Sequence, residues 1–208
     1  MIPDRARLTR QTLINIANRR LRRGTGSLPD LRESKAPMQR WPDLVEVLTG
    51  IPWAVAGAVA ARLYMPERMT RDLDVVMLPE DRERVSERLI SAGYEKEGNL
   101  SIGGSSWRAP DGTPVDVIEG AEEWWPIALR EAAANPDEEG AFVLTAPYLV
   151  LMKLLAGRMQ DVADVGRMLG GMTEPDLGRV RDVVREHAPP LNEDLESMIV
   201  LGKLEQQG

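Results

Sequence analysis

The chain of 208 residues contains no cysteine, only one histidine and no long apolar run. The lack of cysteine excludes disulfides, thiol catalysis and cysteine-ligated zinc. His187 alone cannot form a histidine metal cluster, and we interpret it as a surface histidine near a helix end. No apolar run approaches the roughly 18 residues that a membrane span requires. Because the start also lacks the apolar segment of a signal peptide, we expect a soluble, cytoplasmic protein with no membrane partner.

Familiar motifs for phosphate and metal binding are also missing. The patterns G-x-x-x-x-G-K-[ST], G-x-G-x-x-G and H-E-x-x-H do not occur in the chain. The segment DLDVVM (72–77) lacks the glycine and the third ligand position of an EF-hand loop. Any nucleotide or metal chemistry must therefore come from another arrangement of residues.

Charge is distributed unevenly along the chain, whose net charge is −7. Residues 1–23 hold seven arginines and one acid, so this arm carries +6 and the remaining residues carry −13. The spacing of Leu13, Ile16, Ala17 and Leu21 predicts an amphipathic helix in the arm. Its arginines suit the phosphates of RNA, but they equally suit the acidic surface of the same chain. Glycine, proline and serine in residues 24–43 predict a linker.

Residues after 43 alternate between helical and strand patterns. We expect a short helix at 44–48, strands at 51–57 and 72–78, and helices at 58–64 and 80–94, with Val85, Leu89 and Ile90 of the last one facing inward. Short β segments follow up to Gly120, with a hairpin signal at Asp111-Gly112. The remaining expected elements are a helix at 122–134, a short strand at 141–146 and helical segments at 148–171, 174–188 and 191–205.

These elements predict an α+β (mixed α/β) fold with a mixed sheet flanked by helices. We divide the chain into a basic N-terminal helix and linker (1–40), a sheet-containing domain (41–144) and a C-terminal helical region (145–208).

Asp72 and Asp74 lie at the start of the strand in RMTRDLDVVM (68–77). Residues two apart in a strand share a side, at roughly 6.6–6.8 Å between α-carbons, so the two carboxylates repel unless water or a cation neutralises them. Asp116 is a third strand carboxylate, which an adjacent antiparallel strand could bring opposite the pair. Three oxygen ligands suit Mg²⁺, with Mn²⁺ as a substitute. The alternative is a solvated strand end.

Gly57 lies at the turn from the preceding strand into a helix, in WAVAGAVAARLY (53–64). Backbone N–H groups at such a turn can receive a phosphate. The alternative is a glycine that merely allows close packing.

These residues, in this order, resemble the nucleotidyltransferase superfamily related to DNA polymerase β, in particular its minimal and abortive-infection-toxin-like (AbiEii-type) members. In these proteins a G-G or G-S turn precedes a strand of the form R-x-T-x-D-h-D-h, where h is apolar. A later helix has the form K-x-x-A-x-x-x-R-x-x-D-x-x-D, in which the spacing between the alanine and the arginine varies; here one residue separates them. The resemblance covers about residues 50–169, and the matching positions are Gly57, Arg68, Thr70, Asp72, Asp74, Asp116, Lys153, Ala156, Arg158, Asp161 and Asp164.

The resemblance implies Mg²⁺-dependent transfer of a nucleoside monophosphate from an NTP such as ATP to an acceptor hydroxyl on RNA or tRNA, protein or a small molecule. Asp72, Asp74 and Asp116 would hold two metal ions, and Asp116 would also help to deprotonate the acceptor. The expected nucleotide-binding residues are Gly57, Ala58, Arg68, Thr70, Lys153, Arg158 and Asp161.

One departure from the family pattern keeps other functions open. Ala58 stands where the family has a second glycine or a serine, so no side-chain hydroxyl can bind a phosphate there. A catalytically silent relative that binds a nucleotide or a partner, such as the other half of a toxin–antitoxin pair, is the alternative. A third interpretation is nucleic-acid binding through the arginine-rich arm alone. Lys153 and Arg158 could also simply pair with Asp161 and Asp164 on a solvated face.

Overall fold

The computed structural model describes residues 41–66 and 69–206. The expectations for the basic arm, for most of the linker and for Arg68 therefore lie outside the described residues. The described elements are β1 (Trp53–Val55), α2 (Gly57–Ala61), β2 (Leu73–Met77), η2 (Pro79–Asp81), α3 (Arg82–Ser91), β3 (Glu95–Asn99), β4 (Gly104–Arg108), β5 (Pro114–Glu119), α4 (Trp125–Ala132), α5 (Ala146–Ala156), α6 (Met159–Gly170), α7 (Glu174–His187), η3 (Pro189–Leu191) and α8 (Asn192–Gln206).

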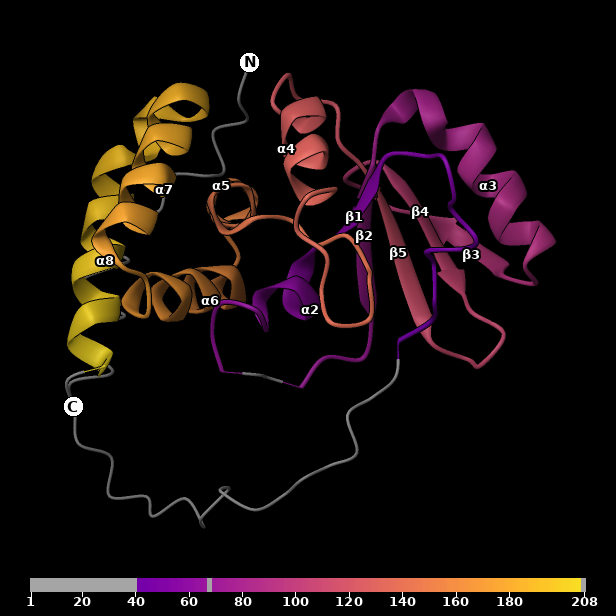
Figure 1. Cartoon of the computed structure of the whole chain (residues 1–208), viewed down its shortest axis with the longest axis horizontal. Coiled ribbons are helices and arrows are strands. Elements are labelled where there is room, and N and C mark those ends of the chain that lie inside the picture. The colour runs from indigo at the N-terminus through magenta and orange to yellow at the C-terminus, as the bar shows by residue number, and fades with distance from the viewer. Residues whose placement is uncertain (1–40, 67–68, 207–208) are drawn as a thin grey trace, which may run out of the picture.

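Five strands form one sheet in the order β1-β2-β5-β4-β3 (Figure 1). The central strands β2 and β5 are parallel, and the other neighbouring pairs are antiparallel. The sheet is therefore mixed, and helices flank it, which confirms the expected α+β class. The parallel pair matters for the site because it sets Asp74 of β2 beside Asp116 of β5.

Helix α3 lies on one face of the sheet, where a cavity of about 380 Å³ between helix and sheet is lined by Val85, Met77 and Trp107 among others. Val85 and Leu89 are buried as expected, but Ile90 is 62% exposed. The inward prediction for Ile90 was wrong because consecutive helical residues point about 100° apart, so a helix that buries Leu89 turns its neighbour outward.

Two predicted elements do not form as such. Residues 45–50 are hydrogen-bonded turns instead of a helix, and the segment reverses at Gly50, whose φ is +75°. Residues 141–146 contribute only isolated β-bridges, of which Val55–Val143 is one. The segment still covers the outer edge of β1, because Val55 N–H donates to Phe142 O and Leu144 N–H donates to Val55 O.

The predicted helical stretch 148–171 is two helices. Helix α5 ends at Ala156 because Gly157 adopts a left-handed conformation (φ +62°), which terminates helices and which other residues rarely adopt. Helix α6 begins at Met159 with Arg158 as its N-cap residue. The break turns the chain, so that side chains of α5 and α6 face each other instead of following one helix.

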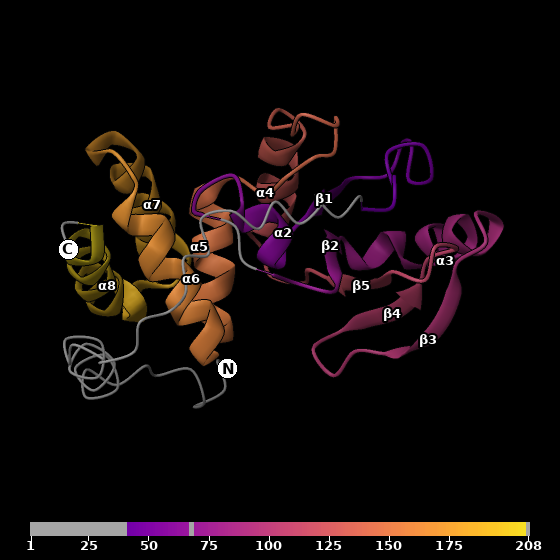
Figure 2. The ribbon, with the colours of Figure 1, turned by 90° about the horizontal axis from the view of Figure 1, so that it is seen from below.

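The helices α5 to α8 gather at one end of the molecule and the β3–β4 hairpin lies at the other (Figures 1 and 2). Helices α6 and α8 approach so closely that a Cβ on Gly202 would lie 2.1 Å from the Gly166 carbonyl oxygen. Within residues 41–66 and 69–206, no helix is long and apolar enough to cross a membrane. The division at residue 145 into two regions stays a prediction.

Candidate functional site

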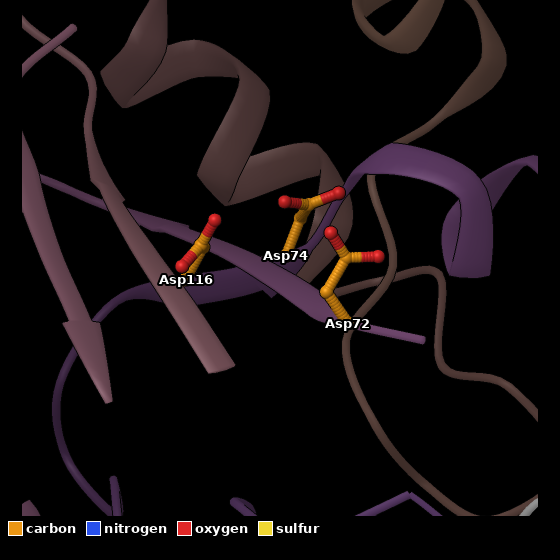
Figure 3. Close-up of side chains that lie close together, drawn as sticks. All are labelled: Asp72, Asp74 and Asp116. Carbon is orange, nitrogen blue, oxygen red and sulfur yellow. The ribbon is translucent and has the colours of Figure 1, made fainter. Parts of the chain in front are cut away.

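Three carboxylates converge on one face of the sheet at its centre (Figure 3). Asp74 lies within β2, Asp72 immediately precedes that strand, and Asp116 lies on β5 directly beside Asp74. One carboxylate oxygen of each residue lies within 4.8 Å of the corresponding oxygens of the other two. The structure thus brings together the three aspartates that the sequence singled out.

The strand of Asp116 runs parallel to β2, and the predicted antiparallel pairing was wrong. The Asp111-Gly112 turn does form a hairpin, but it joins β4 to β5. The chain leaves β2 through α3 and returns through the β3–β4 hairpin, so β5 enters beside β2 in the same direction. Residues paired in a parallel register project from the same face of the sheet. Asp74 and Asp116 are such a pair and therefore lie on one face.

Gly57 lies in direct contact with the carboxylate of Asp74. Its φ is +61°, and a Cβ at this position would lie 1.7 Å from Asp74 Oδ2. Glycine is therefore required here for two reasons, the backbone conformation and the approach of the carboxylate. Ala56 N–H donates to Asp74 O at 2.8 Å and fixes the turn against β2. Ala58 is 4% exposed, so its methyl group belongs to the interior.

Asp74 is held in a state that resists ionisation. Burial, followed by the charges of Asp72 and Asp116, raises the pKa of Asp74 to about 6, while Arg158 and Lys153 act in the opposite direction. A cation among the three carboxylates would relieve this repulsion. A donor set made only of carboxylate oxygens, with room left for water and phosphate ligands, fits Mg²⁺.

Thr70 orients one of the carboxylates. Its hydroxyl Oγ1 donates to Asp72 Oδ1 at 2.6 Å. The sequence had grouped Thr70 with the nucleotide-binding residues, and the structure shows it contacting a candidate metal ligand. The bond restricts Asp72, which lies just before the regular part of β2.

Lys153 belongs to a buried ion-pair network between α5 and α6. The lysine is 3% exposed, and its Nζ lies 2.8 Å from Asp164 Oδ2 and 3.3 Å from Asp161 Oδ1. Gln160 Nε2 donates to the other Asp164 oxygen at 3.0 Å. The solvated-face interpretation of Lys153 was therefore wrong, because the break at Gly157 folds α6 back over this part of α5.

Arg158 extends this network, and its charge interacts with Asp74 and Asp72. Its Nε donates to Asp161 Oδ2 at 2.6 Å, yet its side chain is 74% exposed. The hydrogen bond to Asp161 raises the pKa of the Arg158 guanidinium, and the charges of Asp161, Asp74 and Asp72 add to the effect. Arg158 is thus a solvent-accessible cation whose charge interacts with those of Asp74 and Asp72.

Sequence reasoning missed Ser106, which lies on β4 directly beside Asp116. The Asp111-Gly112 turn alone would not have located it, because a two-residue turn at these positions pairs Asp116 with Trp107. The longer connection between β4 and β5 shifts the register by one residue and sets Ser106 opposite Asp116. Arg68, the remaining predicted site residue, lies outside the described part of the chain.

No protein-family model matches the chain, and no curated protein matches it in sequence. Solved structures with a partly similar arrangement of elements include the antibiotic-resistance factor ANT(2″)-Ia in solution, with 16% identity, a TM-score of 0.42 and coverage of 76% of this chain and 84% of that one. The crystal structure of ANT(2″)-Ia with adenylyl-2″-tobramycin has 14% identity and a TM-score of 0.41, covering 75% and 89%. The lincomycin-bound lincosamide antibiotic adenylyltransferase LnuA has 11% identity and a TM-score of 0.38, covering 68% and 90%.

Proposed function

We propose that the protein is a Mg²⁺-dependent nucleotidyltransferase that moves a nucleoside monophosphate from an NTP such as ATP to an acceptor hydroxyl. The observation that carries the proposal is the convergence of Asp72, Asp74 and Asp116 on adjacent parallel strands, with one oxygen of each within 4.8 Å of the others. Carboxylates gathered in this way repel one another unless cations join them. The order of Gly57 and the three aspartates along the chain, which resembles the nucleotidyltransferase superfamily, supports the same function.

The three aspartates would hold the metal ions, with Mn²⁺ as a substitute for Mg²⁺. Bound Mg²⁺ would neutralise phosphate charge and make the acceptor hydroxyl more acidic. Arg158 supplies an accessible guanidinium for the triphosphate, and a planar fork of N–H groups suits phosphate oxygens. Lys153 is buried, so its role is to hold Asp161, which in turn orients Arg158.

The transfer is an in-line displacement at the α-phosphorus. The acceptor oxygen forms a bond to phosphorus while the bond to the bridging α,β-oxygen breaks, and pyrophosphate leaves with that electron pair. The hydroxyl proton passes to Asp116, which lies on β5 directly beside Asp74. The products are a nucleotidylated acceptor and pyrophosphate.

A catalytically silent nucleotide-binding protein is the second candidate, and Ala58 favours it. Ala58 is buried and has no hydroxyl, so one phosphate ligand of the family pattern is missing. Such a protein would bind Mg²⁺ and ATP and form no product. Its binding partner would then be a protein, with a toxin or antitoxin as the first candidate.

The two functions are separated by incubating the full-length protein with each α-³²P-labelled NTP, Mg²⁺ and a cell lysate, then fractionating RNA, protein and small molecules. Label in one fraction supports transfer and identifies the acceptor class. Asp74→Asn should abolish the label, while Asp182→Asn, an exposed carboxylate paired with Arg185 on α7, should not. Saturable ATP binding without labelled product would favour the silent protein, and neither binding nor label would exclude both.

A toxin–antitoxin role can be tested separately, by measuring cell growth. Expression of the wild type without its partner should arrest growth, and Asp74→Asn should relieve the arrest if transfer causes it. Normal growth with the active wild type would exclude a toxin and favour a metabolic or modifying enzyme.

A further inference from the structure

The face of the sheet opposite the three aspartates carries the cavity beside helix α3. Side chains alternate along a strand, so Val117 of β5 projects away from the side of Asp116. Ser105 of β4 pairs with Val117 and shares its face, as does Trp107 two residues further on. Helix α3 lies along this part of the sheet (Figures 1 and 2), and the cavity of about 380 Å³ lies between them. The sheet therefore separates this cavity from the carboxylate cluster.

Strand β3 presents two polar side chains to the cavity because its pairing with β4 is irregular. Lys96 pairs with Trp107. Asn99 pairs with Ser105, and the register shifts between the two pairs. Glu97 is the extra residue of this bulge, so Lys96 and Asn99 share a face although they are three residues apart. In a regular strand, residues three apart face opposite sides. The bulge thus brings both side chains to the lining of the cavity.

The polar side chains of the lining offer hydrogen-bond donors that the fold does not use. The side chains of Lys96, Asn99 and Ser86 form no hydrogen bond or ion pair with any residue that the structure describes. Ser105 Oγ accepts from Trp107 Nε1 at 2.8 Å, which leaves the hydroxyl proton of Ser105 available. Because Ser86 lies on α3 and the others lie on β3 and β4, these donors come from both walls.

The charges of the lining favour an anion. Among the described residues that line the cavity, Glu119 is the one acid, and its two oxygens accept from Nε and Nη2 of Arg82. This ion pair has no net charge, and Arg82 Nη1 keeps its donors. Lys96 then leaves the lining with a net charge of +1. A phosphate ester offers three strong acceptor oxygens, so it can accept from donors on the helix and on the sheet at once.

We propose that this cavity binds a small phosphomonoester with a polar body. Lys96 of β3 and Ser86 of α3 donate to the phosphate, while Asn99 and Ser105 donate to hydroxyl groups of the body. The volume of about 380 Å³ exceeds what a phosphate ion needs and falls in the range of roughly 300–1,000 Å³ typical of small-molecule sites. The site does not involve the three aspartates, so it goes beyond the proposed function and does not depend on it.

The ligand class is tested by isothermal titration calorimetry on the full-length protein without Mg²⁺ or nucleotide. Ribose 5-phosphate is the probe, and it should bind saturably with one molecule per chain. Ribose should bind at least about 100-fold more weakly because it lacks the charged group, and inorganic phosphate about tenfold more weakly because it leaves most of the cavity unfilled. Lack of saturable ribose 5-phosphate binding would overturn the proposal, as would equal binding of ribose or of inorganic phosphate.

The location is tested with two variants of the lining. Lys96→Gln should weaken ribose 5-phosphate binding about 10- to 100-fold, and Ser86→Ala about tenfold, since each removes a hydrogen bond to a charged group. Their unfolding temperatures should match that of the wild type, because Lys96 is exposed and Ser86 has no side-chain partner among the described residues. Unchanged binding by Ser86→Ala would overturn a site between the two walls.

Arg108→Gln is the matched control for charge. It removes a cation from the same hairpin, but Arg108 follows Trp107 on β4 and therefore projects from the opposite face. This variant should bind ribose 5-phosphate like the wild type, and so should Asp74→Asn. Equal weakening by Lys96→Gln and Arg108→Gln would assign the binding to the general charge of the chain and overturn the cavity site. Loss of binding in Asp74→Asn would place the probe at the carboxylate cluster instead and overturn it as well.

Discussion

Ionisation of Asp74 costs the folded protein free energy, because the pKa of this residue is raised. Its pKa rises from 3.8 to about 6, so protonation stabilises the folded protein fully below about pH 4, and this contribution is lost as pH rises through 6. The metal-free protein should therefore lose up to about 3 kcal/mol from this group between pH 4 and pH 7. Asp74→Asn should be more stable than the wild type at pH 7 without metal, as measured by urea unfolding.

The same variant, Asp74→Asn, distinguishes two interpretations of the three aspartates: a metal site and a solvated strand end. Mg²⁺ should stabilise the wild type at pH 7 by an amount that grows with its concentration, since it binds only the folded state. Asp74→Asn should lose most of this gain, and Asp182→Asn should keep it. A wild type that is equally stable with and without Mg²⁺ and Mn²⁺ would contradict the metal assignment.

Gly57 permits no side chain because Asp74 occupies the space. Gly57→Ala should destabilise the protein by more than the roughly 1–2 kcal/mol that a left-handed conformation costs a residue with a Cβ, since the methyl would also push the carboxylate away. Mg²⁺ binding should weaken in parallel. Gly178→Ala is the control, because a Cβ there meets no atom within 4 Å and alanine favours the α7 helix. Equal stability of both variants would refute the contact.

At the scale of elements, the turn between α5 and α6 buries Lys153 and leaves Arg158 exposed, so we expect the two cations to have different roles. Lys153→Met should cost about 3–5 kcal/mol, because it leaves Asp161 and Asp164 buried without this cation. Arg158→Gln should change stability by only about 0–1 kcal/mol, since the guanidinium is exposed, but should weaken ATP binding. Urea unfolding and titration with an ATP analogue test both. Similar loss of stability in the two variants would contradict this division.

Most elements and the three aspartates could be predicted from the sequence, because strand alternation and turn residues are local signals. The parallel direction of β5 relative to β2 could not be predicted, because local patterns do not show which strand lies on the other side of a hairpin. The burial of Lys153 was missed for the same reason: it depends on a reversal at Gly157 that a continuous helical pattern hides. Ile90 was misplaced because its neighbour Leu89 occupies the buried side of α3, and consecutive helical residues point in different directions.

At the scale of the whole molecule, the positive charge in residues 1–23 contrasts with −13 in the rest of the chain. If the acceptor is RNA, removing the arm should weaken RNA binding and flatten its salt dependence, by about 0.7 in the log–log slope for each single-strand phosphate that the arm neutralises. ATP-analogue affinity should stay unchanged, because the site lies within residues 57–164. Equal RNA affinity and slope for both forms would favour a protein or small-molecule acceptor.

The parallel pairing of β2 and β5 also determines when the site can form during folding. Because α3 and the β3–β4 hairpin separate Asp74 from Asp116 in the sequence, their pairing is non-local, and we expect it to form late in folding. Ions that need all three carboxylates then stabilise the native state more than the transition state. Added Mg²⁺ should therefore slow unfolding and leave the refolding rate nearly unchanged. Stopped-flow measurements with and without Mg²⁺ would reveal this as a shift confined to the unfolding limb.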